Sequence, residues 1–136
     1  MTERREARKQ SVEERVRIAN KIAKKSNQCL VWCDYNYESE MLYKAIHGSV
    51  EVKGSDDPEH KKNAMIGFAA GKIKTLISKP SICGFGMNWQ NCNQMIFCGL
   101  SDSYEQFYQA IRRCYRFGQQ NAVDVYVIIS EKEMKE

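Results

Sequence analysis

Two features of nucleotide-hydrolysing proteins are missing from the 136-residue sequence. There is no phosphate loop of the form Gly-x-x-x-x-Gly-Lys-Ser/Thr, and no acidic pair follows a predicted strand where it could hold magnesium. These absences exclude a self-contained P-loop ATPase. Apolar runs also stay well short of the roughly 18 residues that a membrane-spanning helix needs, and the charged N-terminus is unlike a signal peptide. We therefore expect a cytoplasmic protein that does not bind membranes.

Metal-binding patterns are absent as well. The six cysteines form no Cys-x-x-Cys pair and have no histidine at zinc spacing, so we expect no metal site. The two histidines, His47 and His60, are expected to be unpartnered surface residues without a role. Several cysteines and both tryptophans are instead expected to pack in the core. These are Cys29, Cys33, Cys98, Trp32 and Trp89.

Charge is unevenly placed along the chain. Residues 1–25 hold nine Lys or Arg against four Glu, whereas the remaining residues hold twelve against thirteen acidic ones. A basic N-terminal segment favours polyanions such as DNA, although a solvated helix face explains it equally well. The hydrophobic content of 43% and charged content of 28% are typical of one globular domain with a proper core.

Helices and strands alternate along the predicted domain. Residues 1–10 are expected to be frayed, and a helix over 12–25 is predicted from an apolar stripe and a capping box of Ser11 with Glu14. Alternation of short apolar runs with helices predicts an α/β domain, in which a parallel sheet carries helices on both faces. The predicted strands span residues 29–33, 50–52, 75–78, 95–98 and 122–129.

The most informative stretch is Gln-Ala-Ile-Arg-Arg-Cys-Tyr-Arg-Phe-Gly-Gln at residues 109–119. Asp102 and Ser103 offer N-caps for a helix, and Gly118 offers a stop. In such a helix Gln109, Arg113 and Arg116 share one narrow face, because they lie at i, i+4 and i+7. Two guanidinium groups on one stripe suit phosphate oxygens, but from spacing alone a solvated basic face is equally compatible.

This stretch resembles motif VI of the Swi/Snf-like helicases of superfamily 2, of bacterial or phage type. Gln109, Arg113, Arg116 and Gly118 recur at the family's spacing, and the family's Val-x-Val-Tyr strand follows at residues 123–126. The resemblance implies a three-layer RecA-like domain. It also implies that Arg113 and Arg116 act catalytically on ATP bound by a partner domain, with Gln109 contacting the nucleotide.

Two further segments resemble motifs of the same family. Gly84, Gly86 and Asn88 resemble part of motif V, which implies a cofactor-binding loop that couples DNA contact to the ATP site. An ordinary strand-connecting turn is the alternative, but residues 84–119 match the family's spacing without a gap. The residues just before, 79–83, depart from the family's Ser-Thr-Arg-Ala-Gly.

The region around motif IV supplies candidate DNA contacts. Ser55 and Lys61 match the family's positions, with Lys61 in place of an arginine, so charge is kept while the bidentate fork is lost. Ser55 is the better phosphate contact, since hydroxyl groups position DNA without reading its sequence, although a plain helix cap explains it equally. Lys79, after the third predicted strand, completes the DNA-binding set.

The resemblance covers residues 28–130, which we expect to form the second RecA-like domain. Residues 1–27 are then a basic helical extension and 131–136 a polar tail. The expected function is the second lobe of an ATP-dependent DNA helicase or translocase, with ATP and magnesium held mainly by a first lobe. Two alternatives are a non-catalytic nucleic-acid or protein interaction module and a stand-alone flavodoxin-like mononucleotide-binding domain. The arginine pair argues against the first, and the missing glycine-rich loop after the first strand argues against the second.

Overall fold

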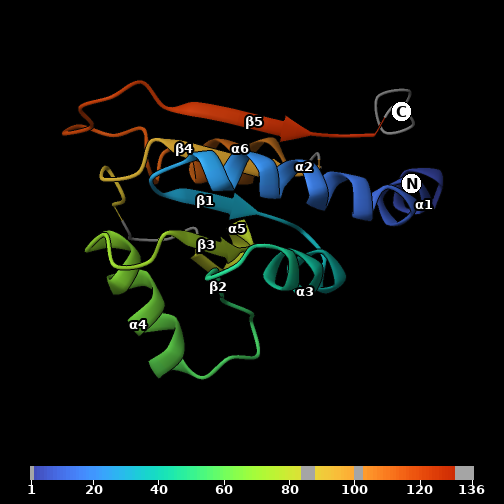
Figure 1. The fold of residues 1–136 in the computed structure, drawn as a ribbon, viewed down its shortest axis with the longest axis horizontal. Coiled ribbons are helices and arrows are strands. Elements are labelled where there is room, and N and C mark those ends of the chain that lie inside the picture. Colours follow the sequence, from blue (N-terminus) through green and yellow to red (C-terminus); the bar gives the residue numbers. More distant parts are fainter. Residues whose placement is uncertain (1, 84–87, 100–102, 131–136) are drawn as a thin grey trace.

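The computed structural model describes residues 2–83, 88–99 and 103–130. Figure 1 shows a central sheet with its helices packed in front of and behind it. The elements alternate as the sequence predicts, and the bounds of the strands lie within one or two residues of the predicted ones. They are α1 (Thr2–Gln10), α2 (Val12–Lys25), β1 (Cys29–Trp32), α3 (Asn36–Ala45), β2 (Val50–Glu51), α4 (Pro58–Ala69), β3 (Thr75–Ser78), α5 (Pro80–Cys83), β4 (Gln94–Cys98), α6 (Tyr104–Ile111) and β5 (Asp124–Ile128).

The sheet has five strands in the order β2-β3-β1-β4-β5, and every pairing is parallel. Val31 in the central strand β1 lies beside Ile77 of β3 and Ile96 of β4. The predicted parallel sheet is therefore confirmed. Because the strands are parallel, the loops after β1, β2, β3 and β4 all leave from one edge, the carboxyl edge.

Both faces of the sheet are covered, which explains why the central strands are apolar along their whole length. Helices α2 and α3 pack on one face, against Val31, Ile77 and Ile96. Helices α4, α5 and α6 pack on the other, against Leu30 and Met95. Figure 1 shows α2 in front of β1 and β4, with α6 behind them. The predicted three-layer α/β architecture is confirmed.

The predicted core residues are also confirmed. Cys29, Cys33 and Cys98 are buried free thiols, and burial raises the pKa of Cys29 to about 12. Trp32 and Trp89 are almost wholly buried, and the Trp89 ring meets the ring of Phe68 edge-on at 5.3 Å between centroids.

The N-terminus differs from the prediction. Residues 2–10 form helix α1 rather than a frayed end, and Ser11 makes no side-chain cap. The Ser11 hydroxyl donates instead to the carbonyl of Arg8 and accepts from Arg15 Nε. Glu14, the predicted second member of the capping box, pairs with Arg17 on the surface. Tertiary contacts of the arginines thus override the local capping pattern.

Candidate functional site

The arginine segment departs from the predicted geometry. Helix α6 starts as predicted, with the Ser103 side chain accepting from the backbone N–H of Gln106, but it ends at Ile111. Residues 112–118 form turns instead, so Arg113 and Arg116 lie beyond the helix. The prediction that Gln109, Arg113 and Arg116 share one helical face is therefore wrong. We call residues 112–118 the arginine turn.

Tertiary hydrogen bonds explain why the helix stops early. In a continued helix the carbonyls of Arg113 and Cys114 would accept from residues 117 and 118. Here the backbone N–H of Trp89 donates to the Arg113 carbonyl at 2.6 Å. The Gln119 side-chain amide donates to the carbonyls of both Cys114 and Cys92, each at 3.0 Å. These bonds tie the arginine turn to the segment before β4, and Gly118, at φ +98°, lies where the turn ends.

The three arginines of the turn differ in exposure. Arg113 is buried, with only 7% of its surface exposed, and its Nε donates to the Gln109 carbonyl at 3.2 Å. Arg116 is half-buried, and its guanidinium donates to the Arg112 carbonyl at 3.2 Å. Burial, followed by the charges of Arg116 and Arg112, lowers the pKa of Arg113. The turn therefore gathers three guanidinium groups, the kind of side chain that binds phosphate oxygens.

The other predicted cofactor-binding residues are only partly described. Gln109 lies in the last turn of α6 and Asn88 one residue before Trp89, and both are exposed. The backbone N–H of Trp89 donates to the Arg113 carbonyl, so Asn88 is the sequence neighbour of a residue that is hydrogen-bonded to the arginine turn. The predicted loop glycines Gly84 and Gly86 lie outside the described residues.

The predicted DNA-binding residues lie elsewhere, at the carboxyl edge. Lys79 directly follows β3, and its ammonium group donates to Oδ1 of Asn36, the first residue of α3, at 2.7 Å. Ser55 is exposed in the loop after β2, and Lys61 Nζ donates to the Gly54 carbonyl of that loop at 2.9 Å. The arginine turn, in contrast, is bonded to residues 89–92, which lead into the amino end of β4. The structure thus separates the two predicted groups.

A buried ionic cluster that the sequence analysis missed fills the carboxyl edge. The loop after β1 leads to one face of the sheet and the loop after β4 to the other, which opens a crevice between these strand ends. Arg8 and Arg15 occupy it. Both donate to Glu38, at 2.9 Å and 2.8 Å, and both donate to the Cys98 carbonyl at the end of β4. We call Arg8, Arg15 and Glu38 the crevice cluster.

Neighbouring residues are adapted to the crevice cluster. Arg8 also pairs with Asp34 at 3.0 Å, and its guanidinium lies 5.2 Å from the Tyr35 ring centroid. Gly99 has φ +120°, and a side-chain carbon there would collide with the Arg8 guanidinium. The sequence did contain a signal for this cluster. Arg8 and Arg15 are seven residues apart and adjoin Ala7 and Val16, which are buried, so both arginines lie on the apolar side of their helices.

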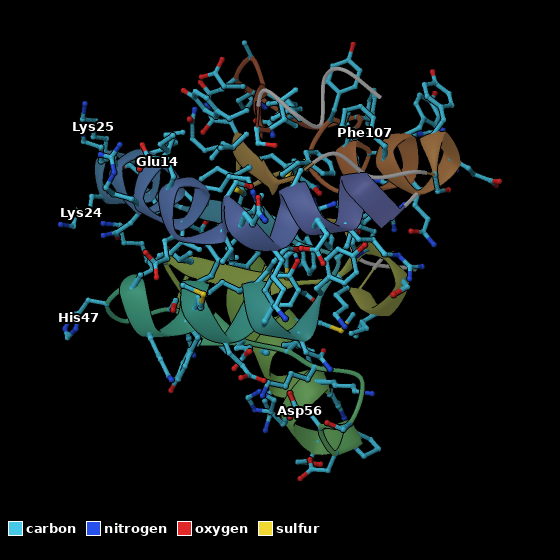
Figure 2. The ribbon with its side chains drawn as sticks, turned by 90° about the vertical axis from the view of Figure 1, so that its right-hand side faces the viewer. Glu14, Lys24, Lys25, His47, Asp56 and Phe107 are labelled. Carbon is cyan, nitrogen blue, oxygen red and sulfur yellow. The ribbon has the colours of Figure 1, made fainter. Side chains whose placement is uncertain are left out.

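Burial of Arg8 and Arg15 also changes how the basic N-terminal segment is understood, since these charges are not available to a polyanion. The lysines that end α2 are exposed and precede the amino end of β1. Figure 2 shows Lys24 and Lys25 pointing outward on the same side as His47. His60, expected to be unpartnered, is not: its ring lies 2.9 Å from the Glu51 carbonyl and 3.6 Å from Asp56.

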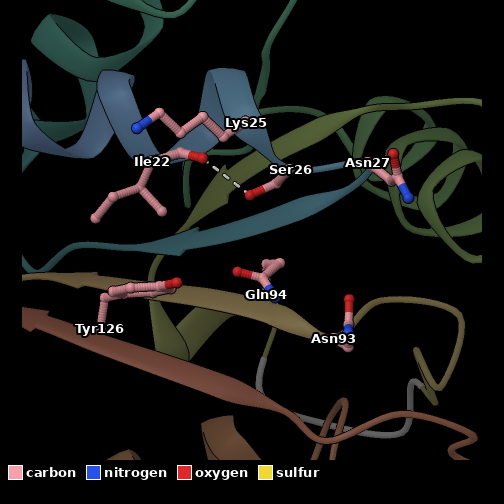
Figure 3. A pocket seen from close by; sticks show the side chains of 7 residues that line it. All are labelled: Ile22, Lys25, Ser26, Asn27, Asn93, Gln94 and Tyr126. Atoms are coloured by element: carbon pink, nitrogen blue, oxygen red, sulfur yellow. Dashed lines mark hydrogen bonds between the residues drawn. The ribbon is translucent and has the colours of Figure 1, made fainter.

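One pocket of about 490 Å³ lies where α2 ends, beside the amino end of β4 and the middle of β5 (Figure 3). Its lining is mostly polar, and the Ser26 hydroxyl is held by the Ile22 carbonyl at 2.9 Å. None of the predicted site residues lines it. The lining residues are Ile22, Lys25, Ser26, Asn27, Asn93, Gln94 and Tyr126.

The described residues contain neither a metal-binding group of side chains nor a membrane-spanning helix. Within residues 2–83, 88–99 and 103–130, no three or more His, Cys, Asp or Glu side chains are grouped so as to hold a metal ion. Over the same ranges, none of the helices has the length and apolar character to cross a bilayer.

Comparison with known proteins gives consistent results. Residues 10–118 match the helicase conserved C-terminal domain. Curated relatives include the "Bifunctional helicase and thymine dioxygenase JBP2" of Leishmania braziliensis and of Leishmania major, which are 24% and 25% identical over 128 residues. That alignment covers 88% of this chain and 11% of each relative, so the chain spans about a tenth of their length.

Two solved structures share the fold. The C-terminal domain of the DEAD-box protein Dbp5 aligns with a TM-score of 0.73 at 12% identity, over 90% of this chain and 74% of that one. The C-terminal part of the Fun30 ATPase domain aligns with a TM-score of 0.69 at 20% identity, over 82% of this chain and 38% of that one.

Proposed function

The chain belongs to the helicase conserved C-terminal domain family, and we propose that it is the second motor lobe of a Swi/Snf-like, ATP-dependent DNA helicase or translocase. In this proposal residues 28–130 form the lobe, and ATP with magnesium is held mainly by a first RecA-like lobe. We use "intact motor" for this chain together with that first lobe. The Swi/Snf-like assignment is supported by the motif VI spacing at residues 109–119.

One observation carries the proposal: the arginine turn places three cations within five residues and bonds them to the segment that follows the motif V loop. Burial, followed by the charges of Arg116 and Arg112, lowers the pKa of Arg113, and three guanidinium groups in one turn suit a polyanion such as a triphosphate. Arg116, half-buried and held by the Arg112 carbonyl, would stabilise charge on the transferring phosphoryl group. Arg113, largely buried, would position the turn and add to the positive potential.

The bond between Trp89 and Arg113 supports a second step of the mechanism. It joins Trp89, which directly follows the residues that resemble motif V, to the arginine turn, so a displacement of Trp89 on DNA binding would move the arginines. DNA itself would run along the carboxyl edge over Ser55, Lys61 and Lys79. The relatives' name, which pairs a helicase with a thymine dioxygenase, supports DNA as the nucleic acid.

The crevice cluster bears on the flavodoxin-like alternative. Domains of that type bind their ligand in the crevice at the carboxyl ends of the strands, where the chain changes direction. Here Arg8, Arg15 and Glu38 fill that crevice. A mononucleotide would have to displace a buried ionic cluster, so this observation favours the motor lobe.

Steady-state ATPase assays test the proposal. We expect this chain alone to show no turnover above buffer, with or without DNA, because it lacks a phosphate loop. The intact motor should turn over ATP, and DNA should stimulate it. DNA-stimulated hydrolysis by the isolated 136-residue chain would refute the half-motor proposal.

A further inference from the structure

Two cysteine thiols meet at the base of the arginine turn. Cys114 belongs to the turn, and Cys92 belongs to the segment that leads into β4. A hydrogen bond joins the two side chains, in which the Cys114 thiol donates to the Cys92 sulfur. Both residues are buried in one core cluster, with Cys114 0% and Cys92 1% exposed. Neither thiol has a part in the proposed phosphoryl transfer.

Backbone and side-chain hydrogen bonds hold the two cysteines side by side. The Gln119 side-chain amide donates to the carbonyls of both Cys92 and Cys114, each at 3.0 Å. The Cys92 N–H donates to the Trp89 carbonyl at 3.0 Å, and the Trp89 N–H donates to the Arg113 carbonyl at 2.6 Å. The pair is therefore tied together on both sides, and a disulfide requires two backbones that are already neighbours.

Cys92 is the more reactive of the two thiols. The hydrogen bond from Cys114 lowers the pKa of Cys92 against the opposing effect of burial, and backbone hydrogen bonds with Gln94 and Leu30 lower it further. The same hydrogen bond, followed by burial, raises the pKa of Cys114. Because the thiolate is the reactive form, Cys92 is the favoured nucleophile among the described cysteines. Burial raises the pKa of the other three, which are Cys29, Cys33 and Cys98.

From the paired side chains and the bonds that hold them, we propose that Cys92 and Cys114 are a redox-sensitive pair, which a hydroperoxide converts into a disulfide that displaces the arginine turn. The chain neighbours Asn91 and Tyr115 are exposed, so the pair lies just beneath surface segments. Local opening of these segments admits an oxidant as small as hydrogen peroxide. The inference goes beyond the proposed function, because the disulfide forms whether or not ATP is hydrolysed.

The oxidation takes place in two balanced steps. The Cys92 thiolate attacks one oxygen of hydrogen peroxide, the O–O bond breaks, and the other oxygen leaves as hydroxide, which takes up the proton that Cys92 gave up. The Cys114 sulfur then attacks the Cys92 sulfenic acid, the S–S bond forms, and the hydroxyl group leaves with the Cys114 proton as water. Two thiols thus lose two electrons and two protons, and one hydrogen peroxide is reduced to two waters.

Closing the disulfide shifts the arginine turn. Hydrogen-bonded sulfurs have to approach one another by roughly 1–2 Å to reach the S–S bond length of about 2 Å. The close-packed core around Cys92 and Cys114 restricts rotation of their side chains, so the surface turn moves instead. Arg113 and Arg116 move with it, and a misplacement of about 1 Å in a catalytic site lowers rates by roughly 100-fold.

Peroxide treatment of the reduced 136-residue chain tests the disulfide. Mass spectrometry of peptides should show Cys92 linked to Cys114 with the loss of two hydrogen atoms, and dithiothreitol should reverse the link. Cys92→Ala and Cys114→Ala should each abolish it. Cys29→Ala is the matched control, because Cys29 is a buried thiol close enough to Cys92 for their charges to interact, and it should keep the link. Circular dichroism checks that each variant is folded.

Two measurements test the displacement. The Trp89 amide, which is bonded to the Arg113 carbonyl, should exchange its hydrogen about tenfold faster or more in the oxidised chain. ATP turnover of the intact motor should fall by about tenfold or more on oxidation and recover with dithiothreitol. The Cys92→Ala motor should show the same turnover before and after peroxide.

Each contrary result overturns the inference at a defined step. Oxidation that leaves Cys92 and Cys114 as thiols, or links either of them to Cys29, refutes the pair, and this result needs no variant. A Cys92–Cys114 disulfide with unchanged Trp89 exchange refutes the displacement. An equal loss of turnover in the wild-type and Cys92→Ala motors refutes control of turnover by this pair. Full turnover of an Arg116→Ala motor refutes the proposed function instead, and leaves the disulfide and the exchange result standing.

Discussion

Arg113 and Arg116 lie three residues apart but have different surroundings. Arg113 is buried and bonded to the carbonyl of Gln109, so it supports the turn as well as adding charge. Arg116 is more exposed, and its contact with the Arg112 carbonyl holds it near the surface. Truncation of the two side chains should therefore affect ATP turnover and stability differently.

We predict that Arg116→Ala lowers ATP turnover of the intact motor by about 10³-fold, the size of an arginine-finger effect, without lowering the thermal midpoint. Arg113→Ala should lower both turnover and stability, the latter by about 1–3 kcal/mol, because a buried side chain is lost. Arg116→Lys should also fail, since an ammonium group lacks the planar fork. ATPase rates and thermal melts of each variant check these expectations.

Arg112→Ala is the internal control. Because Arg112 is exposed, its truncation should lower ATP turnover much less than truncation of Arg113 or Arg116. A larger loss for Arg112 than for Arg116 would mean that the catalytic register is wrong by one position or more. Unfolding of the Arg116 variant would instead make this residue structural and remove it from the candidate site.

At the scale of elements, the crevice cluster joins four of them: α1 and α2 supply the arginines, α3 supplies Glu38, and β4 supplies the Cys98 carbonyl. Glu38 is wholly buried, and it also accepts from the backbone N–H groups of Asp34 and Tyr35. Burying charges is unfavourable unless all are paired, so loss of one partner leaves the others uncompensated.

We predict that Glu38→Gln destabilises the isolated chain by about 3–5 kcal/mol, because it removes the buried carboxylate charge that the Arg8 and Arg15 guanidinium groups share. Chemical denaturation monitored by circular dichroism measures the change. Arg17→Ala is the matched control: it breaks an ion pair that is fully exposed, with Glu14, and should leave the denaturation midpoint unchanged. A Glu38→Gln midpoint equal to that of the control would contradict the structural role of the cluster.

Local pattern predicted most elements, and tertiary contacts account for the rest. The central strands are apolar on both faces, so their runs in the sequence were unambiguous, and Ser103 caps its helix as predicted. The end of α6 was not predictable, since it depends on Trp89 and on Gln119, which take two carbonyls away from the helix. Helix α1 was missed because its main stabilising contacts, those of Arg8, are made with residues 26 to 90 positions away.

At the scale of the whole molecule, the candidate contacts divide between the two ends of the sheet. Lys79 and Ser55 lie at the carboxyl edge, and the arginine turn is bonded to the segment entering the amino end of β4. A motor lobe with this division can contact a track at one end and a nucleotide at the other. Lys24 and Lys25, at the end of α2, are on the side away from the proposed track.

We predict weak, sequence-independent DNA binding whose affinity falls steeply between low and physiological salt, because phosphate contacts release counterions. Lys79→Gln should weaken binding and reduce the salt dependence, whereas Lys25→Gln, an equal change of charge near the amino edge, should do so much less. Fluorescence anisotropy with two unrelated duplexes at several salt concentrations is the measurement. Binding that resists salt or strongly prefers one duplex would count against a backbone-tracking surface.

The crevice cluster also has a consequence for synthesis on the ribosome. Arg8 leaves the ribosome before the Cys98 carbonyl that it bonds, which follows 90 residues later. At about 5–20 residues per second, that delay is roughly 5–18 seconds. During this interval β1 lacks its neighbour β4, and the N-terminal helices lack the Cys98 carbonyl and the β4 side chains Ile96 and Cys98 of their core cluster. The nascent chain therefore exposes one side of the apolar strand β1 until β4 is made, which is the stage at which a chaperone has most to protect.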